Sequence, residues 1–138
     1  MSVITEFHVT VPGRPAPQGS KKMGAYGQMR ESSPYLPAWR AAVKAAVYAG
    51  YEVRGVRPED LPLFRGPVAM GVTFWLPGPA RIDGPPDLDK LLRGLWDALT
   101  LARVWEDDSR VVEIMWASKD LAQGDGFIGA DLTVRSAG

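Results

Sequence analysis

The stretch DLDKLLRGLWDALT, residues 87–100, governs how the rest of the chain is interpreted. Its apolar residues recur at i, i+3, i+4, i+7, i+8 and i+11, the spacing of one face of an amphipathic helix. These residues are Leu88, Leu91, Leu92, Leu95, Trp96 and Leu99. Pro85-Pro86 disfavours helix immediately upstream, because a residue before proline is pushed toward extended geometry. We therefore expect the helix to begin at about Asp89 and to end near Thr100.

Two aspartates stand where this helix begins. In a continuous helix, Asp87 and Asp89 would lie about 200° apart around the axis and could not share a ligand. If Asp87-Leu88-Asp89 is extended, both carboxylates point to one side while Leu88 turns into the core. Asp89 then becomes the N-cap or a first-turn residue, next to a helix terminus that favours phosphate.

A divalent cation is the ligand that such a pair suggests. Mg²⁺ takes oxygen ligands, keeps several waters, and often bridges one or two carboxylates to a substrate phosphate. A third donor is available in Glu106-Asp107-Asp108, at the turn into the next strand. Aspartates also cap helices and build turns without any metal, so the spacing alone leaves a purely structural role open.

Outward from this stretch, strands and helices alternate. Apolar residues recur at every second position in four segments, which predicts strands over 3–11, 68–76, 110–117 and 127–135. A first helix is expected from Pro37 to Gly50, and residues 12–34 form a basic, flexible loop. The fold class is therefore a single α/β (α+β) domain over residues 1–138, with a mixed sheet of about four strands and two helices. The order is β-loop-α-β-α-β-β.

Composition limits the classes of function. The 138 residues are 46% hydrophobic and 23% charged, which is typical of a globular domain. The chain has no cysteine, which excludes disulfides and zinc–thiolate sites. No apolar run approaches the roughly 20 residues that span a bilayer, and the N-terminus lacks signal-peptide features. We expect a cytoplasmic protein with no membrane contact and, without a phosphate-binding glycine loop, no nucleotide cofactor.

Charge is distributed unevenly although the formal net charge is zero. Residues 1–58 hold eight Lys/Arg against three acids, and residues 59–138 hold eight against thirteen. A polyanion-binding arm beside an acidic, cation-binding site would give this asymmetry. Chance segregation of charges on a solvated surface is the alternative.

Several motifs together resemble the RusA-type Holliday junction resolvases. They are Pro86-Asp87-Leu88-Asp89 opening a helix, Leu91, Trp96-Asp97-Ala98-Leu99-Thr100 near its end, and Val104-Trp105-Glu106-Asp107-Asp108 running into Val111-Val112. The resemblance is close over roughly residues 85–113, and the combined pattern is far more specific than any one of its pieces.

The resemblance implies a crossover junction endodeoxyribonuclease that acts in DNA recombination and repair. By it, Asp87, Asp89 and Asp108 match three catalytic aspartates that bind Mg²⁺, with Mn²⁺ as a substitute. Asp97 and Asp107 match positions that are commonly acidic. The family's members are homodimers that nick two strands of a four-way junction, so the implied partner is branched DNA.

The chain departs from the family pattern at two basic positions. The family usually has Asn directly after the second aspartate and a catalytic Lys three residues later, where this chain has Lys90 and Arg93. Arg93 can clamp a phosphate but does not readily donate a proton. We expect Arg93 to be the catalytic cation and Lys90 to be a DNA contact.

The expected DNA-binding residues are mostly in the basic loop. They are Arg14, Lys21, Lys22, Arg30 and Lys90. Two other functions remain open from the sequence: a metal-dependent nuclease acting on other branched DNA or on RNA, and a non-catalytic junction-binding protein. Only the alternative nuclease would use the same metal site.

Overall fold

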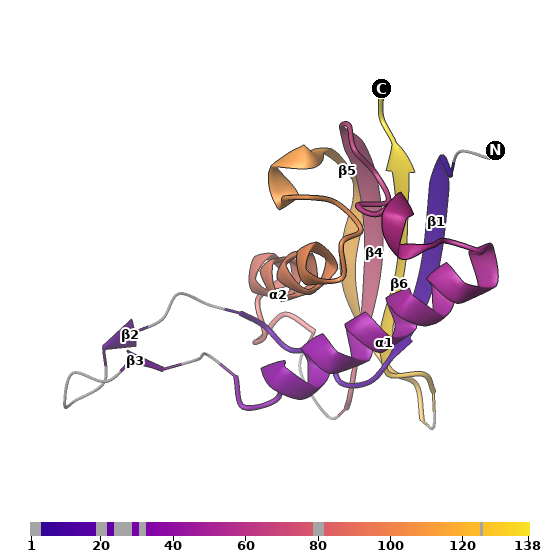
Figure 1. Ribbon diagram of the computed structural model, residues 1–138. Helices are drawn as coiled ribbons and strands as arrows, with labels where there is room; N and C mark the ends of the chain where they lie inside the picture. The colour runs from indigo at the N-terminus through magenta and orange to yellow at the C-terminus, as the bar shows by residue number, and fades with distance from the viewer. Residues whose placement is uncertain (1–3, 19–21, 24–28, 31–32, 79–81, 125) are drawn as a thin grey trace.

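The central sheet has four strands in the spatial order β1-β6-β4-β5 (Figure 1). In the computed structural model, residues 4–18, 22–23, 29–30, 33–78, 82–124 and 126–138 are described. The strands are β1 (Glu6–Pro12), β4 (Val68–Leu76), β5 (Val111–Leu121) and β6 (Gly129–Ser136). The other elements are α1 (Leu36–Arg54), α2 (Leu88–Leu101), and the short 3-10 turns η1 (Pro58–Asp60) and η2 (Asp108–Arg110). This arrangement confirms the expected α/β class and element order.

Strand direction makes the sheet mixed. β6 pairs antiparallel with both β1 and β4, whereas β4 pairs parallel with β5. A parallel pair needs a long crossover, and α2 supplies it between β4 and β5. The segment from β4 through α2 to β5 is therefore a β-α-β unit, and it contains every candidate catalytic residue.

Both helices cover the same face of the sheet, α1 against β1 and α2 against β5 (Figure 1). Alternate residues of β1, Phe7, Val9 and Val11, are buried beneath α1, as period-2 patterning requires. From α2, Leu91 and Leu95 are fully buried. The core therefore lies between this helical layer and one sheet face.

The first helix runs further than the sequence suggested. The expected stop at Gly50 is wrong, because α1 continues to Arg54 and ends at Gly55, whose φ of 70° is the left-handed conformation that glycine favours. Gly50 has a packing role: a Cβ there would lie 2.9 Å from the ring of Phe7. Gly50 therefore lets the helix approach β1 closely.

The two edges of the sheet differ in the side chains that they expose. On β1 and β6, His8 Nε2 lies 2.8 Å from Asp131 Oδ1. At the other edge, β5 exposes the side chains of Val112, Ile114 and Trp116. This apolar strip of three residues has no cover among the described residues, and β5 has a strand on one side only.

The expected loop between β1 and α1 contains one small regular element. β2 (Lys22–Met23) and β3 (Met29–Arg30) pair antiparallel, apart from the main sheet (Figure 1). No helix in the described parts of the chain is both long and apolar enough to cross a membrane.

Candidate active site

Asp87 and Asp89 occupy the first positions of α2. Asp87 is the N-cap, with the extended backbone (φ −68°, ψ 141°) that Pro85-Pro86 favoured, and the helix begins at Leu88, one residue before the expected start. Leu88 packs against the core, as expected. The Asp87 side chain makes no capping hydrogen bond, and Lys90 Nζ lies 3.8 Å from its Oδ2. Both carboxylates therefore stay exposed and open to a ligand.

Three charged residues share one stripe of α2. Asp89, Arg93 and Asp97 follow one another at intervals of four residues, so each lies about one turn beyond the last. Asp89 and Asp97 are separated by about 12 Å along the helix axis at 1.5 Å per residue. Arg93 is exposed and has no hydrogen bond or ion pair among the described residues. Its guanidinium is therefore available between two carboxylates.

Asp108 lies near this stripe but belongs to a different element. It opens η2, which contacts α2, and its side chain is half-buried. Burial raises the pKa of the Asp108 carboxyl, and the negative charges of Asp107 and Asp97 raise it further. Asp97 and Asp108 therefore form a pair of mutually repelling carboxylates that a cation would stabilise.

The pKa of Asp107 is shifted in the opposite direction to that of Asp108. Its Oδ2 accepts a hydrogen bond from the backbone N–H of Ser109 at 3.0 Å and caps η2. Hydrogen bonding to Ser109 lowers the pKa of Asp107. Asp107 thus stays ionised and holds the turn, while adding to the repulsion that acts on Asp108.

The predicted metal trio is divided between two places. Asp87 and Asp89 lie at the start of α2, whereas Asp108 is near Asp97 in the second half of the helix. Among the residues that the structure describes, no three acidic or histidine side chains are close enough together to hold a metal ion. By resemblance, Asp97 matches a position that is commonly acidic in the family, but it was not among the predicted site residues. The signal that could have added Asp97 to the site was its spacing of four residues from Arg93.

Lys119 contacts the turn beside the candidate site, a contact for which the sequence offered no spacing argument. From the inner face of β5, its ammonium donates to the carbonyl oxygens of Gly84 at 2.7 Å and Pro86 at 2.9 Å. These carbonyls belong to the turn that leads into Asp87. Lys119 therefore fixes the backbone on which the first aspartate stands, through a contact that depends on the parallel pairing of β4 and β5.

The basic loop is anchored on α2. The N–H of Gln18 donates to the Lys90 carbonyl at 3.0 Å, and a Cβ at Gly94 would lie 2.8 Å from the Ala16 carbonyl oxygen. The Arg14 guanidinium stacks 3.9 Å from the ring centre of Tyr35, where the loop returns. The loop therefore leaves and re-enters the domain beside the candidate site.

The remaining predicted DNA-binding residues lie further along this loop. Lys22 is paired with Arg30 across β2 and β3. Lys21 lies outside the described residues. All of the expected DNA contacts in the loop stay predictions.

Comparison with known families adds one finding. The family model described as endodeoxyribonuclease RusA matches residues 12–125 of the chain. The match covers the basic loop, both helices and β4 and β5, and so includes every candidate site residue. No curated protein matches the chain.

Proposed function

The chain belongs to the RusA family of Holliday junction-resolving endodeoxyribonucleases, and from this membership we propose that its active site is the carboxylate row of α2 and η2. The row consists of Asp87, Asp89, Asp97 and Asp108. Family membership makes the chain a metal-dependent hydrolase that acts on branched DNA. The observation that carries the placement of the site is the contact between α2 and η2, which brings Asp108 close to Asp97. Burial, the charge of Asp107 and the charge of Asp97 together raise the pKa of Asp108.

Mg²⁺ is the ion that suits these residues. All the donors are carboxylate oxygens, and Mg²⁺ is usually held by one or two carboxylates together with substrate phosphates rather than by a complete protein cage. This preference agrees with a row in which the described residues form no cluster of three. Asp97 with Asp108, and Asp87 with Asp89, would each supply such a partial site. When bound, the cation polarises the scissile phosphate and lowers the pKa of its water.

The basic residues of α2 would act on the DNA phosphates. Arg93 is exposed between Asp89 and Asp97, where a guanidinium can contact two oxygens of one phosphate and stabilise the charge that develops during cleavage. Lys90 lies beside Asp87 and is half-exposed, which suits a neighbouring backbone contact. Among the residues that the structure describes, the Lys119 ammonium donates only to backbone carbonyls, and so it would position Asp87 without touching DNA.

The loop would hold the junction against this row. Arg14, Lys21, Lys22 and Arg30 would contact DNA backbone, which lysine and arginine do without regard to sequence. The anchoring of Gln18 and Ala16 on α2 supports this role, because it directs the loop outward from the active-site helix.

A homodimer would give the paired nicks that resolution requires. The free edge of β5 and its strip of Val112, Ile114 and Trp116 could pair with the same strand of a second copy, since a two-fold axis brings identical surfaces together. Ile114→Glu would then convert a dimer to a monomer in light scattering, while Val53→Glu on the exposed face of α1 would not. A wild-type monomer at the concentrations used for cleavage would contradict the dimer.

The experiment that tests the site is cleavage of a labelled synthetic four-way junction with and without Mg²⁺. We expect symmetric, Mg²⁺-dependent nicks from the wild type and a loss of at least about 100-fold in rate for Asp89→Asn and Asp108→Asn. Glu52→Gln removes one charge from the exposed side of α1 and should leave the rate unchanged. Tight junction binding with no product under any divalent metal would favour a non-catalytic binder. Cleavage of flaps or RNA in preference to junctions would assign another substrate.

A further inference from the structure

A hollow lies beside the C-terminal end of α2, and two arginines are among the residues that line it. The hollow, of about 560 Å³, is lined by Leu61, Arg65, Thr100, Arg103, Trp105 and Glu106, among others. Glu106 is two residues from Asp108 in the chain, and Thr100 is three residues from Asp97, so the hollow lies toward the end of the candidate row that holds Asp97 and Asp108. We call it the Arg65–Arg103 pocket.

Two guanidinium groups converge in this pocket. Nη2 of Arg65 donates to the Leu61 carbonyl oxygen at 3.3 Å, and Nη2 of Arg103 donates to the same oxygen at 3.2 Å. The two nitrogens therefore lie no more than about 6.5 Å apart. Within the described ranges, neither arginine has a carboxylate partner. Glu106, the acid that lines the pocket, is paired with Arg110 at 3.4 Å.

The backbone fixes both arginines in place. The N–H of Leu63 donates to the Arg103 carbonyl at 3.0 Å, and that of Phe64 donates to the Val104 carbonyl at 2.9 Å. These bonds tie the segment that carries Arg65 to the segment that carries Arg103. The convergence of the two side chains is therefore built into the fold.

Arg103 holds its place at an energetic cost. Its φ is 63°, and it alone among the described non-glycine residues has a positive φ. It occupies the first position beyond the C-cap of α2: its N–H bonds the Thr100 carbonyl, and the N–H of Val104 bonds the Leu99 carbonyl. Glycine is the residue that this helix-ending motif favours. A residue in a pocket that combines backbone strain with a guanidinium lacking a carboxylate partner is a candidate for a function other than ending the helix.

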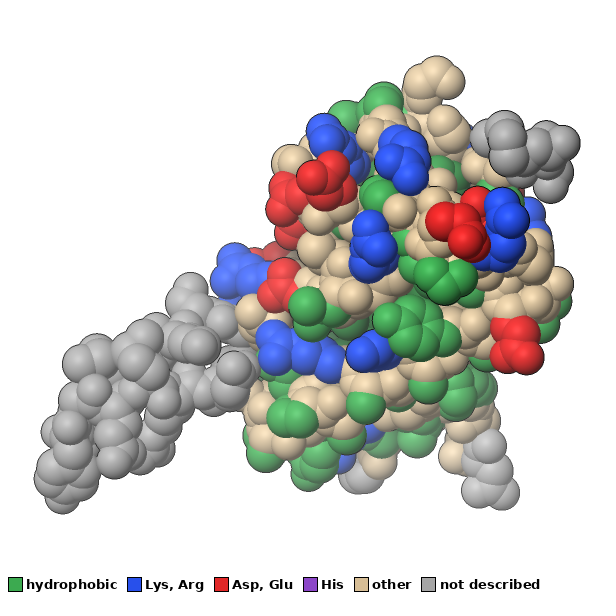
Figure 2. Space-filling view, viewed as in Figure 1, with side chains coloured by type: hydrophobic (Ala, Val, Ile, Leu, Met, Phe, Trp, Pro, Cys, Tyr) green, Lys and Arg blue, Asp and Glu red, His purple; other side chains and the backbone are tan. Residues whose placement is uncertain are grey.

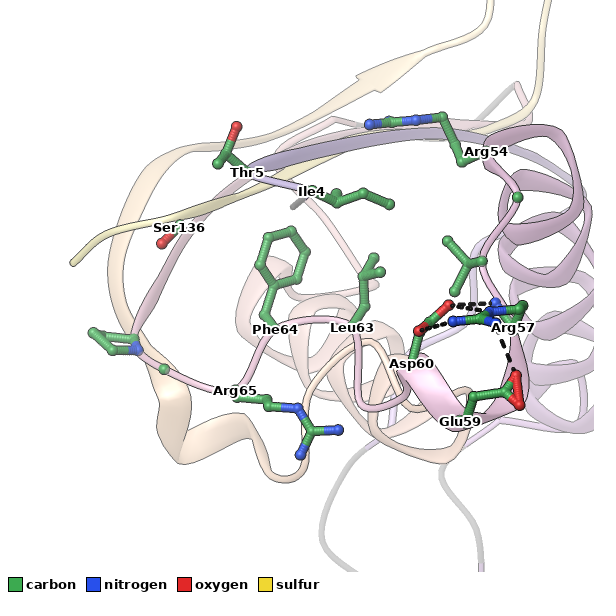
Figure 3. Close-up of a pocket in the computed structure, with 14 residues that line it drawn as sticks. Ile4, Thr5, Arg54, Arg57, Glu59, Asp60, Leu63, Phe64, Arg65 and Ser136 are labelled. Atoms are coloured by element: carbon green, nitrogen blue, oxygen red, sulfur yellow. Dashed lines mark hydrogen bonds and ion pairs between the residues drawn. The ribbon is translucent and has the colours of Figure 1, made fainter. Parts of the chain in front are cut away.

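A nearby arginine shows what a purely structural role looks like. Arg57 is closed into contacts with Asp60 and Glu59, while the guanidinium of Arg65 lies apart from both acids (Figure 3). Over the face that carries α1 and α2, Lys and Arg groups lie among Asp and Glu groups rather than in a separate basic half (Figure 2). The arginines of the pocket, which have no carboxylate partner among the described residues, therefore differ from Arg57, which two acids hold.

We propose that the Arg65–Arg103 pocket binds a backbone phosphate of the DNA that flanks the phosphate to be cleaved. Two guanidiniums around one hollow match the oxygens of a phosphodiester, and charge-assisted hydrogen bonds of this kind are the strongest that arginine makes. The inference rests on the proposed function for its ligand, but it concerns binding and not the chemical step.

The test is junction affinity, measured by fluorescence anisotropy with Ca²⁺ in place of Mg²⁺. Arg103→Gly is the informative variant, because it removes the charge and also relieves the backbone strain. We expect a higher melting temperature together with about tenfold weaker binding, and a log–log salt dependence shallower by about one. Arg65→Gln should weaken binding similarly, and Arg57→Gln, with the same change in net charge, should bind within about twofold of wild type.

Unchanged junction affinity in Arg103→Gly would overturn the proposal and reduce Arg103 to a helix-ending residue. The phosphate could also come from a free ion, which titration with inorganic phosphate distinguishes. A stabilisation by phosphate that Arg103→Gly loses, with DNA affinity unaltered, would likewise overturn the DNA assignment. If wild type binds the junction but does not cut it, the catalytic proposal fails. The pocket proposal then stands or falls on the affinities alone.

Discussion

Lys119 holds the backbone of Pro86, the residue that precedes the first candidate aspartate. Its ammonium lies 2.9 Å from the Pro86 carbonyl oxygen and 2.7 Å from that of Gly84. The side chain comes from β5, and its two acceptors lie in the segment between β4 and α2. One lysine therefore connects the last strand of the β-α-β unit to the turn that precedes its helix. Lys119 therefore holds in place the turn that carries Asp87, at the helix start that Pro85-Pro86 favours.

Replacing this lysine tests its positioning role. Lys119→Met should lower the free energy of unfolding by about 1–3 kcal/mol, because two hydrogen bonds from a charged donor are lost. Amide hydrogen exchange over residues 82–91 should accelerate, and the Mg²⁺ concentration for half-maximal cleavage should rise. Lys44→Met, on the exposed side of α1, is the control. Exchange in 82–91 equal to wild type would show that Lys119 does not position the turn.

Asp108 should destabilise the metal-free protein at neutral pH. Its pKa is raised by burial and by the charges of Asp107 and Asp97, so the folded state holds this proton more tightly than the unfolded state does. The stability it contributes is present below the unfolded pKa and is lost as pH rises through the folded pKa. In EDTA at pH 7, Asp108→Asn should therefore raise the free energy of unfolding, by up to about 1 kcal/mol for a half-exposed group.

Mg²⁺ should make the wild type more stable than Asp108→Asn, the reverse of their order in EDTA. At ten times its dissociation constant, a ligand stabilises the folded state by about 1.4 kcal/mol. We expect that increase for the wild type and a smaller one for Asp108→Asn, measured by thermal unfolding. An equal increase in both proteins would remove Asp108 from the metal site.

Asp107 should set the acidic limit of cleavage through its effect on Asp108. Asp107→Asn keeps an oxygen to accept the Ser109 N–H but removes a negative charge. The pKa of Asp108 then falls, so Asp108 stays ionised to lower pH and the acidic limb of the pH–rate profile moves to lower pH. Glu52→Gln should leave the profile in place. A shift toward higher pH would contradict the coupling.

Gly94 should be required for the position of the basic loop. A Cβ there would lie 2.8 Å from the Ala16 carbonyl oxygen, which is backbone and cannot rotate away. Gly94→Ala should cost about 1–3 kcal/mol of stability, as overpacking does, and should weaken junction binding by displacing the loop. Gly66→Ala, with open space around its Cβ, is the matched control. Normal affinity in a destabilised Gly94→Ala protein would separate the loop from DNA binding.

Local patterns predicted the elements well because each depends on near neighbours in the chain. The strand over Val68–Leu76 was predicted to the residue, since its alternation is bounded by proline and glycine. The end of α1 was not predicted correctly. Gly50 looks like a helix-ending glycine in sequence, but in the structure it makes room for the ring of Phe7, which lies far away in the chain. A glycine that permits close packing and a glycine that ends a helix look alike in sequence.

The site shows the same division. Asp87 and Asp89 were placed at the start of α2 from sequence, because Pro85-Pro86 fixes where that helix begins. The contacts of Lys119, Arg65 and Arg103 were not foreseen, since each depends on segments that meet only in the folded domain. Arg103 in particular carries no sequence signal of its left-handed backbone.

The position of β6 between β1 and β4 has a consequence for how the chain assembles. Among the described strands, β1 pairs with β6 alone, and the paired residues His8 and Thr133 are 125 positions apart. A growing polypeptide therefore carries its first strand unmatched until residues 129–136 have been made. The strands of the β4–α2–β5 unit pair with each other and are much closer together in the chain. The catalytic half can thus form early by local contacts, while the layer beneath α1 is completed last.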